Sequence, residues 1–170
     1  MNEVLIIYSS KTGNTKKVAE AIKEVNPYAT ILPTNLVNEK IINESSHIIM
    51  GYWIDKGMPD KNAMDIIEKI HNKKVGIFFT LGAYSDSDHA KKAEEKSIIL
   101  FNKNNNEVLK TFKCQGKIDP ELTLMFENLP ADHPHAMNEE RRKRHLDAKS
   151  HPDENDLKMA REVFKDFGDR

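Results

Sequence analysis

The chain lacks several features that would narrow its function directly. It has one cysteine, Cys114, among 170 residues and therefore cannot form an internal disulfide. No apolar run approaches the ~20 residues that a membrane-spanning helix requires. The first ten residues also lack the basic n-region of a signal peptide. These absences predict a soluble, cytoplasmic protein with no membrane contact.

An excess of charge of either sign is also missing. The 26 Lys and Arg residues and 27 Asp and Glu residues leave a formal net charge of -1. This balance gives no global electrostatic reason to expect nucleic acid or an anionic membrane as a partner. With 38% hydrophobic residues, the chain suits one globular domain over residues 1–170. Partners must therefore be inferred from individual sites.

Apolar strand-like runs alternate with helix-like segments along the chain. The runs lie at 3–8, 28–32, 47–53, 74–82 and 107–116. Apolar residues at helical spacing follow at 14–25, 37–42, 63–70, 87–102 and 157–167. This alternation predicts an α/β fold with a parallel sheet and helices on both faces. Ligands of such sheets bind at the carboxyl ends of the strands, here the turns after Tyr8, Gly51 and Thr80.

The first of these turns reads Ser10, Lys11, Thr12, Gly13, Asn14 and Thr15. It precedes a predicted helix, whose free N–H groups and neighbouring hydroxyls can surround a phosphate. The turn has neither the G-x-x-x-x-G-K-[ST] pattern of a P-loop NTPase nor the G-x-G-x-x-G pattern of a dinucleotide fold. From composition alone, an anion site and an ordinary capped turn stay equally open.

The segment S-K-T-G-N-T after a buried first strand resembles the phosphate loop of flavodoxins, which bind flavin mononucleotide (FMN). "GYWIDKGMPD" at 51–60 and "TLGAYSDSDHA" at 80–90 are similar to the second and third flavin-contact loops of that family. "FKCQGKI" at 112–118 resembles its fifth-strand segment, and the final "HPDENDLKMAREVFKDF" its closing helix. The resemblance implies a flavodoxin-like three-layer sandwich with a five-stranded parallel sheet of order 2-1-3-4-5.

The resemblance also implies the residues that bind the phosphate of FMN. The side chains of Ser10, Thr12, Asn14 and Thr15 would contact the phosphate, and residues 11–15 would add backbone N–H groups. Gly13 would let the backbone approach closely. Lys11 departs from the family pattern, because flavodoxin loops usually neutralise the phosphate without a cationic side chain. We expect Lys11 to be a solvated loop residue, with a contact to the phosphate as the alternative.

Around the flavin ring, the resemblance implies contacts from the two later loops: Trp53, Ile54, Asp55, Gly57, Thr80, Leu81, Gly82 and Tyr84. Trp53 and Tyr84 would stack on opposite faces of the ring, with Tyr52 as a competitor of Trp53. Gly57 would allow a peptide to reorient toward flavin N5. Carboxylates in the same loops, including Asp55 and Asp60, would disfavour an anionic reduced flavin.

The segment at 130–151 is rich in histidine and arginine. His133, His135, His145 and His151 lack the spacing of an H-E-x-x-H site, so we expect no metal and no catalytic residues there. A solvated helix and linker is the favoured interpretation. The alternative is that the basic cluster 141–144 contacts an acidic redox partner.

Three functions remain after these steps. The favoured one is an FMN-binding electron carrier that shuttles single electrons between a donor reductase and an acceptor enzyme. It would be a monomer, and it would not be a self-sufficient enzyme. The alternative is an FMN-dependent NAD(P)H quinone or small-molecule reductase. A binding module without FMN is the third possibility, and the intact phosphate loop argues against it.

Overall fold

The computed structural model describes residues 4–169. Its strands are β1 (Val4–Tyr8), β2 (Thr30–Pro33), β3 (His47–Asp55), β4 (Met58–Pro59), β5 (Lys74–Leu81) and β6 (Glu107–Gln115). Its helices are α1 (Asn14–Glu24), α2 (Glu39–Glu44), α3 (Lys61–Ile67), α4 (Asp88–Lys103), α5 (Pro120–Glu127), α6 (Glu139–Ala148) and α7 (Glu154–Phe164), with a 3-10 turn, η1, at Thr34–Leu36. None of the described helices is long and apolar enough to cross a membrane.

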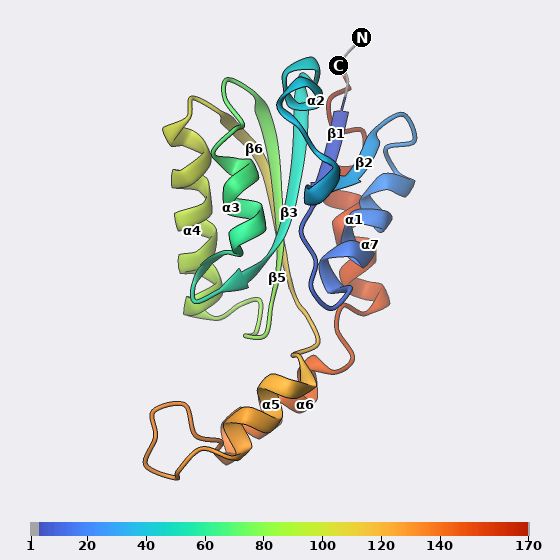
Figure 1. The fold of residues 1–170 in the computed structure, drawn as a ribbon. Helices are drawn as coiled ribbons and strands as arrows, with labels where there is room; N and C mark the ends of the chain where they lie inside the picture. Colours follow the sequence, from blue (N-terminus) through green and yellow to red (C-terminus); the bar gives the residue numbers. More distant parts are fainter. Residues whose placement is uncertain (1–3, 170) are drawn as a thin grey trace.

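Five strands form the parallel sheet in the order β2-β1-β3-β5-β6. The predicted order 2-1-3-4-5 is confirmed, because the short β4 lies off this path and pairs antiparallel with β3. This strand was not predicted, because the resemblance placed the whole segment 51–60 in a flavin-contact loop. Figure 1 shows the sheet edge-on between two helical layers. The fold is therefore the predicted three-layer sandwich.

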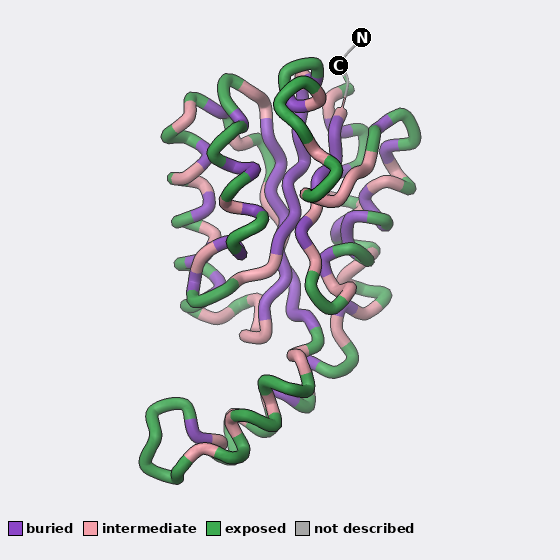
Figure 2. The backbone as a smooth tube through the Cα atoms, in the orientation of Figure 1, coloured by how far each residue is buried: buried purple, intermediate pink, exposed green. Residues whose placement is uncertain are grey.

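The two faces of the sheet have separate apolar cores. Tyr52 and Met50 of β3 pack into the layer of α3 and α4, whereas their neighbour Ile49 packs against α1 and α7. Side chains of successive strand residues point to opposite faces, so a continuously apolar strand supplies both cores. The central strands are accordingly buried over most of their length in Figure 2. Burying each large side chain contributes about 1.5–3 kcal/mol.

Most helix starts are capped by a side chain from the preceding residue. Asn38, Asp60 and Ser87 accept hydrogen bonds from the backbone of α2, α3 and α4 respectively. The residue before α1 is instead Gly13, which has a left-handed φ of 96° and no side chain with which to cap. An L side chain is strained in this conformation. The start of α1 is thus left open to another anion or acceptor.

Residues 116–153 connect β6 to α7 and contain α5 and α6. Such βα connections usually span two to six residues, so this segment is an elaboration of the fold. In Figure 1 it projects as an orange arm from the end of the sandwich where the parallel strands finish. We call residues 117–151 the helical hairpin. The expectation of a helix and linker at 130–151 recovered α6 but missed α5 and the pairing of the two helices.

Candidate functional site

The turn between β1 and α1 lies at the carboxyl end of the sheet, where the sequence placed it. Ser10 Oγ folds back over this turn and accepts hydrogen bonds from the backbone N–H groups of Gly13 (3.1 Å) and Lys16 (3.3 Å). The N–H groups of Asn14 and Thr15 occupy the first helical turn and have no intrahelical acceptor. Together with the positive end of the α1 dipole, they form a donor set suited to a phosphate.

Two loop side chains that were expected to contact a phosphate have other partners in this structure. The hydroxyl of Thr15 is buried and shares a 3.0 Å hydrogen bond with that of Thr80. Asn14 Nδ2 donates to the backbone oxygen of Lys117 at 2.8 Å. The N–H groups of Thr12, Asn14 and Thr15, together with the exposed side chains of Lys11 and Thr12, are therefore groups that the loop leaves for an anion.

Trp53 and Tyr52 lie on opposite sides of β3. Tyr52 is fully buried and stacks on Phe79, with ring centroids 5.9 Å apart. Trp53 is half-buried, and Lys11 Nζ lies 6.0 Å from its ring centroid. Trp53 is therefore the aromatic residue of this pair that lies beside the Ser10–Thr15 turn, while Tyr52 belongs to the core.

Asp60, expected as a carboxylate of the second flavin-contact loop, is buried and caps the start of α3. It is 2% exposed, and its Oδ1 accepts from the Ser9 hydroxyl at 2.6 Å and from the Ala63 N–H at 3.2 Å. These bonds join the end of β1 to the start of α3. Among the described residues, Asp60 Oδ2 has no hydrogen-bond partner. A buried acceptor therefore remains unused next to the Ser10–Thr15 turn.

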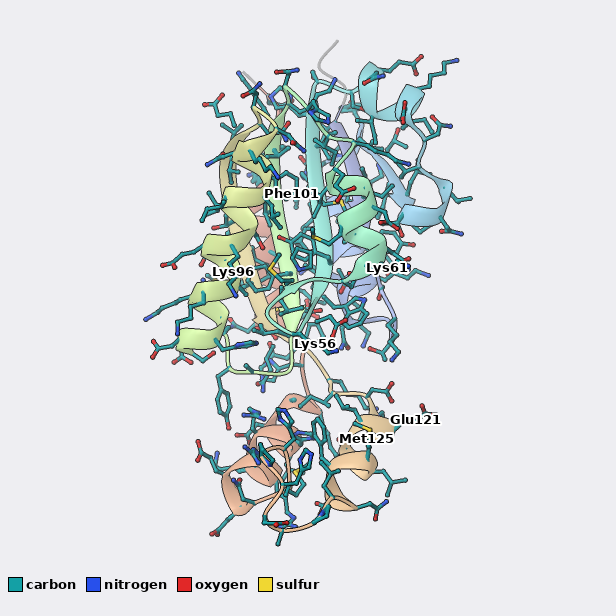
Figure 3. All side chains as sticks on the ribbon, turned by 60° about the vertical axis from the view of Figure 1, so that its left-hand side comes forward. Lys56, Lys61, Lys96, Phe101, Glu121 and Met125 are labelled. Carbon is teal, nitrogen blue, oxygen red and sulfur yellow. The ribbon has the colours of Figure 1, made fainter. Side chains whose placement is uncertain are left out.

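The second loop is a tight β-hairpin turn. Lys56 and Gly57 both have positive φ, 51° and 81°, as a two-residue type I′ turn between paired strands requires. A side chain at position 57 would meet Lys96 and His89 at 3.7 and 3.8 Å, so this turn leans against α4. Figure 3 labels Lys56 at this turn and Lys96 on α4. Ile54 is half-buried, Asp55 is exposed, and the peptide reorientation at Gly57 stays a prediction.

The third loop follows β5, where Thr80 and Leu81 are buried. Tyr84 lies beyond them, and its hydroxyl donates to Asp147 Oδ2 of α6 at 2.7 Å. This hydrogen bond raises the pKa of Tyr84. Lys143 donates to the same carboxylate at 2.9 Å. The hydrogen bond from Lys143 is the larger cause of a lowered pKa of Asp147, and the bond from Tyr84 is the second. Tyr84 is thereby tied to the helical hairpin, and its stacking on a flavin stays a prediction.

Residues 116–119 lead from β6 into the helical hairpin, and we call them its stem; they reach both the first and the third loop. Lys11 Nζ lies 3.6 Å from Asp119 Oδ2, and Asn14 donates to the oxygen of Lys117. Ile118 packs so closely on Gly82 that an added Cβ there would lie 2.8 Å from it. The sequence analysis missed this contribution. The available signal was the length of chain between the edge strand and the closing helix.

The interior of the hairpin is small and contains histidine. His145 is 6% exposed, shares a 2.8 Å hydrogen bond with Thr123, and packs edge-on against Phe126. Burial lowers the pKa of His145, and the charge of Arg144 lowers it further. In the neighbouring basic cluster, Arg142 forms a two-pronged pair with Glu127 at 2.9 Å. Part of the cationic charge expected for an acidic partner is therefore neutralised within the hairpin.

His151, Asp153 and Asp156 form the one His and carboxylate group of metal-binding size among the described residues. His151 Nδ1 lies 2.6 Å from Asp156 Oδ2. Asp153 and Asp156 each accept the other's backbone N–H at 2.9 Å in the capping box of α7. The positive helix terminus already provides a counterpart for both carboxylates, which explains the cluster without a cation.

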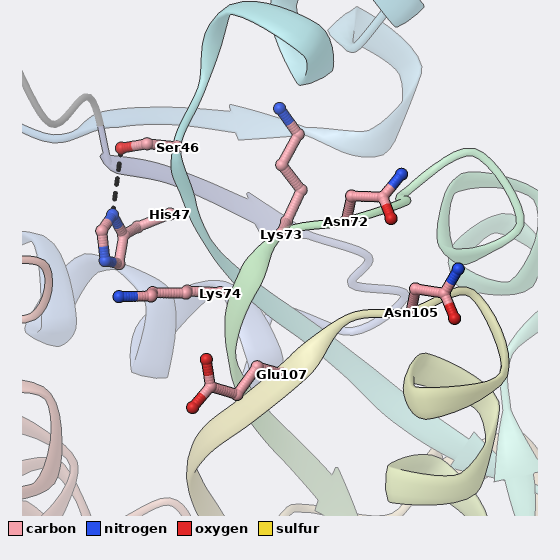
Figure 4. A pocket seen from close by; sticks show the side chains of 7 residues that line it. All are labelled: Ser46, His47, Asn72, Lys73, Lys74, Asn105 and Glu107. Carbon is pink, nitrogen blue, oxygen red and sulfur yellow. Dashed lines mark hydrogen bonds between the residues drawn. The ribbon is translucent and has the colours of Figure 1, made fainter.

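Two cavities lie at opposite ends of the molecule. One, of about 560 Å³, lies between the loop at Tyr84–Asp86 and α6, and Asp147 and His151 also line it. The other, of about 660 Å³, is lined by Lys73, Lys74 and Glu107 among others and is drawn in Figure 4. It lies where β3, β5 and β6 begin, and so at the end of the sheet away from the Ser10–Thr15 turn.

Comparison with known proteins agrees with this geometry. A sequence model of the flavodoxin domain matches residues 5–165. The flavodoxin-like domain-containing protein BilS of Clostridioides difficile is 38% identical over 162 residues, which cover 92% of this chain and 90% of BilS. The fold is similar to that of a WrbA-like flavodoxin from Agrobacterium tumefaciens, with a TM-score of 0.58, 15% identity, and 96% and 99% of the two chains covered. It is also similar to an FMN-complexed flavoprotein from Lactobacillus acidophilus, with a TM-score of 0.53, 16% identity, and 67% and 94% covered.

Proposed function

The chain belongs to the flavodoxin family, and from this premise we propose that it binds FMN and carries single electrons between a reductase and an acceptor enzyme. One observation carries the proposal. The start of α1, which Gly13 cannot cap with a side chain, offers the N–H groups of Asn14 and Thr15 at the carboxyl end of the sheet, next to the half-buried Trp53. A phosphate and a planar ring can be held side by side by such a donor set and an aromatic residue.

The residues present fit FMN in their donor chemistry. The N–H groups of Thr12, Asn14 and Thr15 would bind the phosphate, and the ammonium group of Lys11 would offset part of its charge. Trp53 would cover one face of the flavin and exclude water from it. Bound FMN would supply the redox chemistry by taking up and releasing electrons one at a time. A carrier of this kind needs no general acid or base from the chain.

Substitutions of Gly13 test the phosphate site. Asparagine and aspartate are the side chains least strained in a left-handed conformation and share that strain about equally, and nothing lies within 4 Å of a Cβ placed there. Gly13→Asp would place a carboxylate at the anion site, whereas Gly13→Asn is a control of nearly the same shape. We expect Gly13→Asp to lower the affinity for FMN by about a hundredfold or more and Gly13→Asn to lower it much less. Equal affinities of the two variants would contradict the proposed site.

A second experiment separates the carrier from a self-sufficient reductase. The FMN-loaded protein is mixed anaerobically with NADPH alone and then with NADPH and a flavin-containing reductase. A carrier should be reduced rapidly only in the second mixture. Rapid bleaching by NADPH alone would instead support the NAD(P)H-dependent reductase.

A further inference from the structure

The stem of the helical hairpin holds two polar side chains of the Ser10–Thr15 turn. Asp119 Oδ2 lies 3.6 Å from Lys11 Nζ, and the backbone oxygen of Lys117 accepts the side-chain amide of Asn14 at 2.8 Å. Gly116 lies directly against the same amide, since a Cβ on it would be 2.8 Å from Asn14 Nδ2. A carboxylate and a carbonyl thus occupy donors that an anion in this turn would also use.

We propose that this stem is a competing ligand of the phosphate-binding turn, so that stem docking and binding of the flavin phosphate oppose each other. The inference rests on the proposed binding of FMN and adds a regulatory element to the same site. A phosphate monoester carries between one and two negative charges at neutral pH. Asp119 adds a like charge at the edge of the phosphate site and also pairs with Lys11, a cation of the turn itself.

The contact between Lys11 and Asp119 is weak enough to exchange. The Lys11 side chain is 63% exposed, and exposed ion pairs of this kind contribute little to stability. Asp119 has a second role that keeps it in place, because its Oδ1 caps α5 by accepting the N–H of Glu121 at 3.0 Å. Lys11 can therefore turn to a phosphate while the carboxylate stays close by. The repulsion between Asp119 and the phosphate then lowers the affinity for FMN more than the positioning of Lys11 by Asp119 raises it.

Coupling between two ligands of one site is reciprocal. If the stem weakens binding of FMN, then FMN must weaken docking of the stem. Riboflavin provides a control within the same experiment, because it has the flavin ring but no phosphate. FMN, but not riboflavin, should therefore loosen the start of α5.

The substitution Asp119→Asn removes the charge and preserves the cap, since asparagine is as good an N-cap residue as aspartate. We expect it to raise the affinity for FMN about fivefold, the size of effect that removing one nearby like charge has in a well-solvated anion site. Asp132→Asn is the matched control, because it makes the same charge change in the exposed connection between α5 and α6. This control should leave the affinity for FMN unchanged.

Lys11→Met should act in the opposite direction and lower the affinity for FMN by about fivefold or more. Neither Lys11→Met nor Asp119→Asn should change the affinity for riboflavin. Amide exchange in residues 120–127 of the unaltered protein should be faster with FMN than with riboflavin. Three results would each overturn the proposed competition. They are an equal change in affinity for FMN and riboflavin in these variants, a loss of FMN affinity in Asp119→Asn, and slower amide exchange of α5 with FMN than with riboflavin. If the unaltered protein binds no FMN at all, the proposed function itself fails.

Discussion

The sandwich and the helical hairpin are built from different interactions. The sandwich buries whole side chains of isoleucine, phenylalanine and tyrosine on both faces of its sheet. Within the hairpin, the buried side chains that the structure describes are Ala136, His145 and Ala148. Four of the large apolar side chains exposed on the described surface lie on the hairpin, namely Leu122, Leu124, Met125 and Leu146.

This contrast indicates that the two regions differ in stability. A core of large apolar side chains unfolds cooperatively, whereas a region with few buried contacts can open at a lower cost. The hairpin is attached to the sandwich through polar contacts, including those of Asn14, Lys11 and Tyr84. Its opening should therefore respond to charge and pH more than that of the sandwich does.

The largest expected effect comes from removing a core ring. Phe78 is fully buried and packs against Phe164 with ring centroids 6.2 Å apart, and its ring covers Gly51. Phe78→Ala should lower the free energy of unfolding by about 3–5 kcal/mol in a urea titration. Leu124→Ala, at a hairpin side chain that is 63% exposed, should change it by less than about 0.5 kcal/mol. Similar losses in the two variants would erase the contrast between the regions.

The second prediction concerns the hairpin alone. Phe126 packs between His135 and His145, with ring centroids 6.1 and 6.2 Å away. Phe126→Ala should destabilise the hairpin by about 2 kcal/mol, which is below the range for a fully buried phenylalanine because this ring is only partly buried. Amide exchange should speed up in α5 and α6 and stay unchanged in β3 and β5. A loss of protection throughout the sheet would mean that the two regions unfold together.

The same contrast explains which features were predictable from the sequence. Apolar patterning indicated β1, β3 and β5 as continuous runs because these central strands bury both faces, and it indicated the partly exposed edge strands β2 and β6 from weaker patterns. It did not indicate β4, whose two residues, Met58 and Pro59, pair with β3 because the chain reverses at the Lys56–Gly57 turn. It also missed α5, in which no residue is buried and whose apolar pattern therefore has no core to face.

The candidate site was predictable in its backbone and less so in its side chains. Gly13 and the start of α1 follow from local sequence alone. The partners of Asn14 and Lys11 come from the stem about a hundred residues later, and Asp60 is buried by its contact with Ser9. Contacts between segments so far apart in the chain leave no local signal.

A smaller effect is expected from pH. The pKa of His145 is lowered below its ordinary value of 6.5 in the folded hairpin, chiefly by burial. The unfolded hairpin therefore binds more protons than the folded hairpin. The folded hairpin has its full stability above pH 6.5 and loses stability as the pH falls below that value. The protection factors of the α6 amides, which correct for the pH dependence of intrinsic exchange, should fall as the pH drops from about 7.5 to about 5.5, and His145→Asn should remove most of this fall. His133→Gln, at an exposed histidine of the same hairpin, should preserve it.

The smallest effect should come from Tyr84→Phe. This variant keeps the ring and removes the 2.7 Å hydrogen bond to Asp147, which retains its bond from Lys143. Amide exchange in α6 should increase by no more than about tenfold, because one exposed hydrogen bond contributes little. The urea unfolding of the sandwich should be unchanged. A large shift in that unfolding would show that the third loop depends on the hairpin.

Backbone NMR of the flavin-free protein, titrated with FMN, tests the central claim most directly. If the start of α1 binds the phosphate, the amide resonances of Thr12, Gly13, Asn14 and Thr15 should shift strongly with FMN and only weakly with riboflavin. The indole resonance of Trp53 should shift with both flavins. Saturable shifts confined to residues elsewhere, such as Lys73 and Lys74 at the other end of the sheet, would contradict the account.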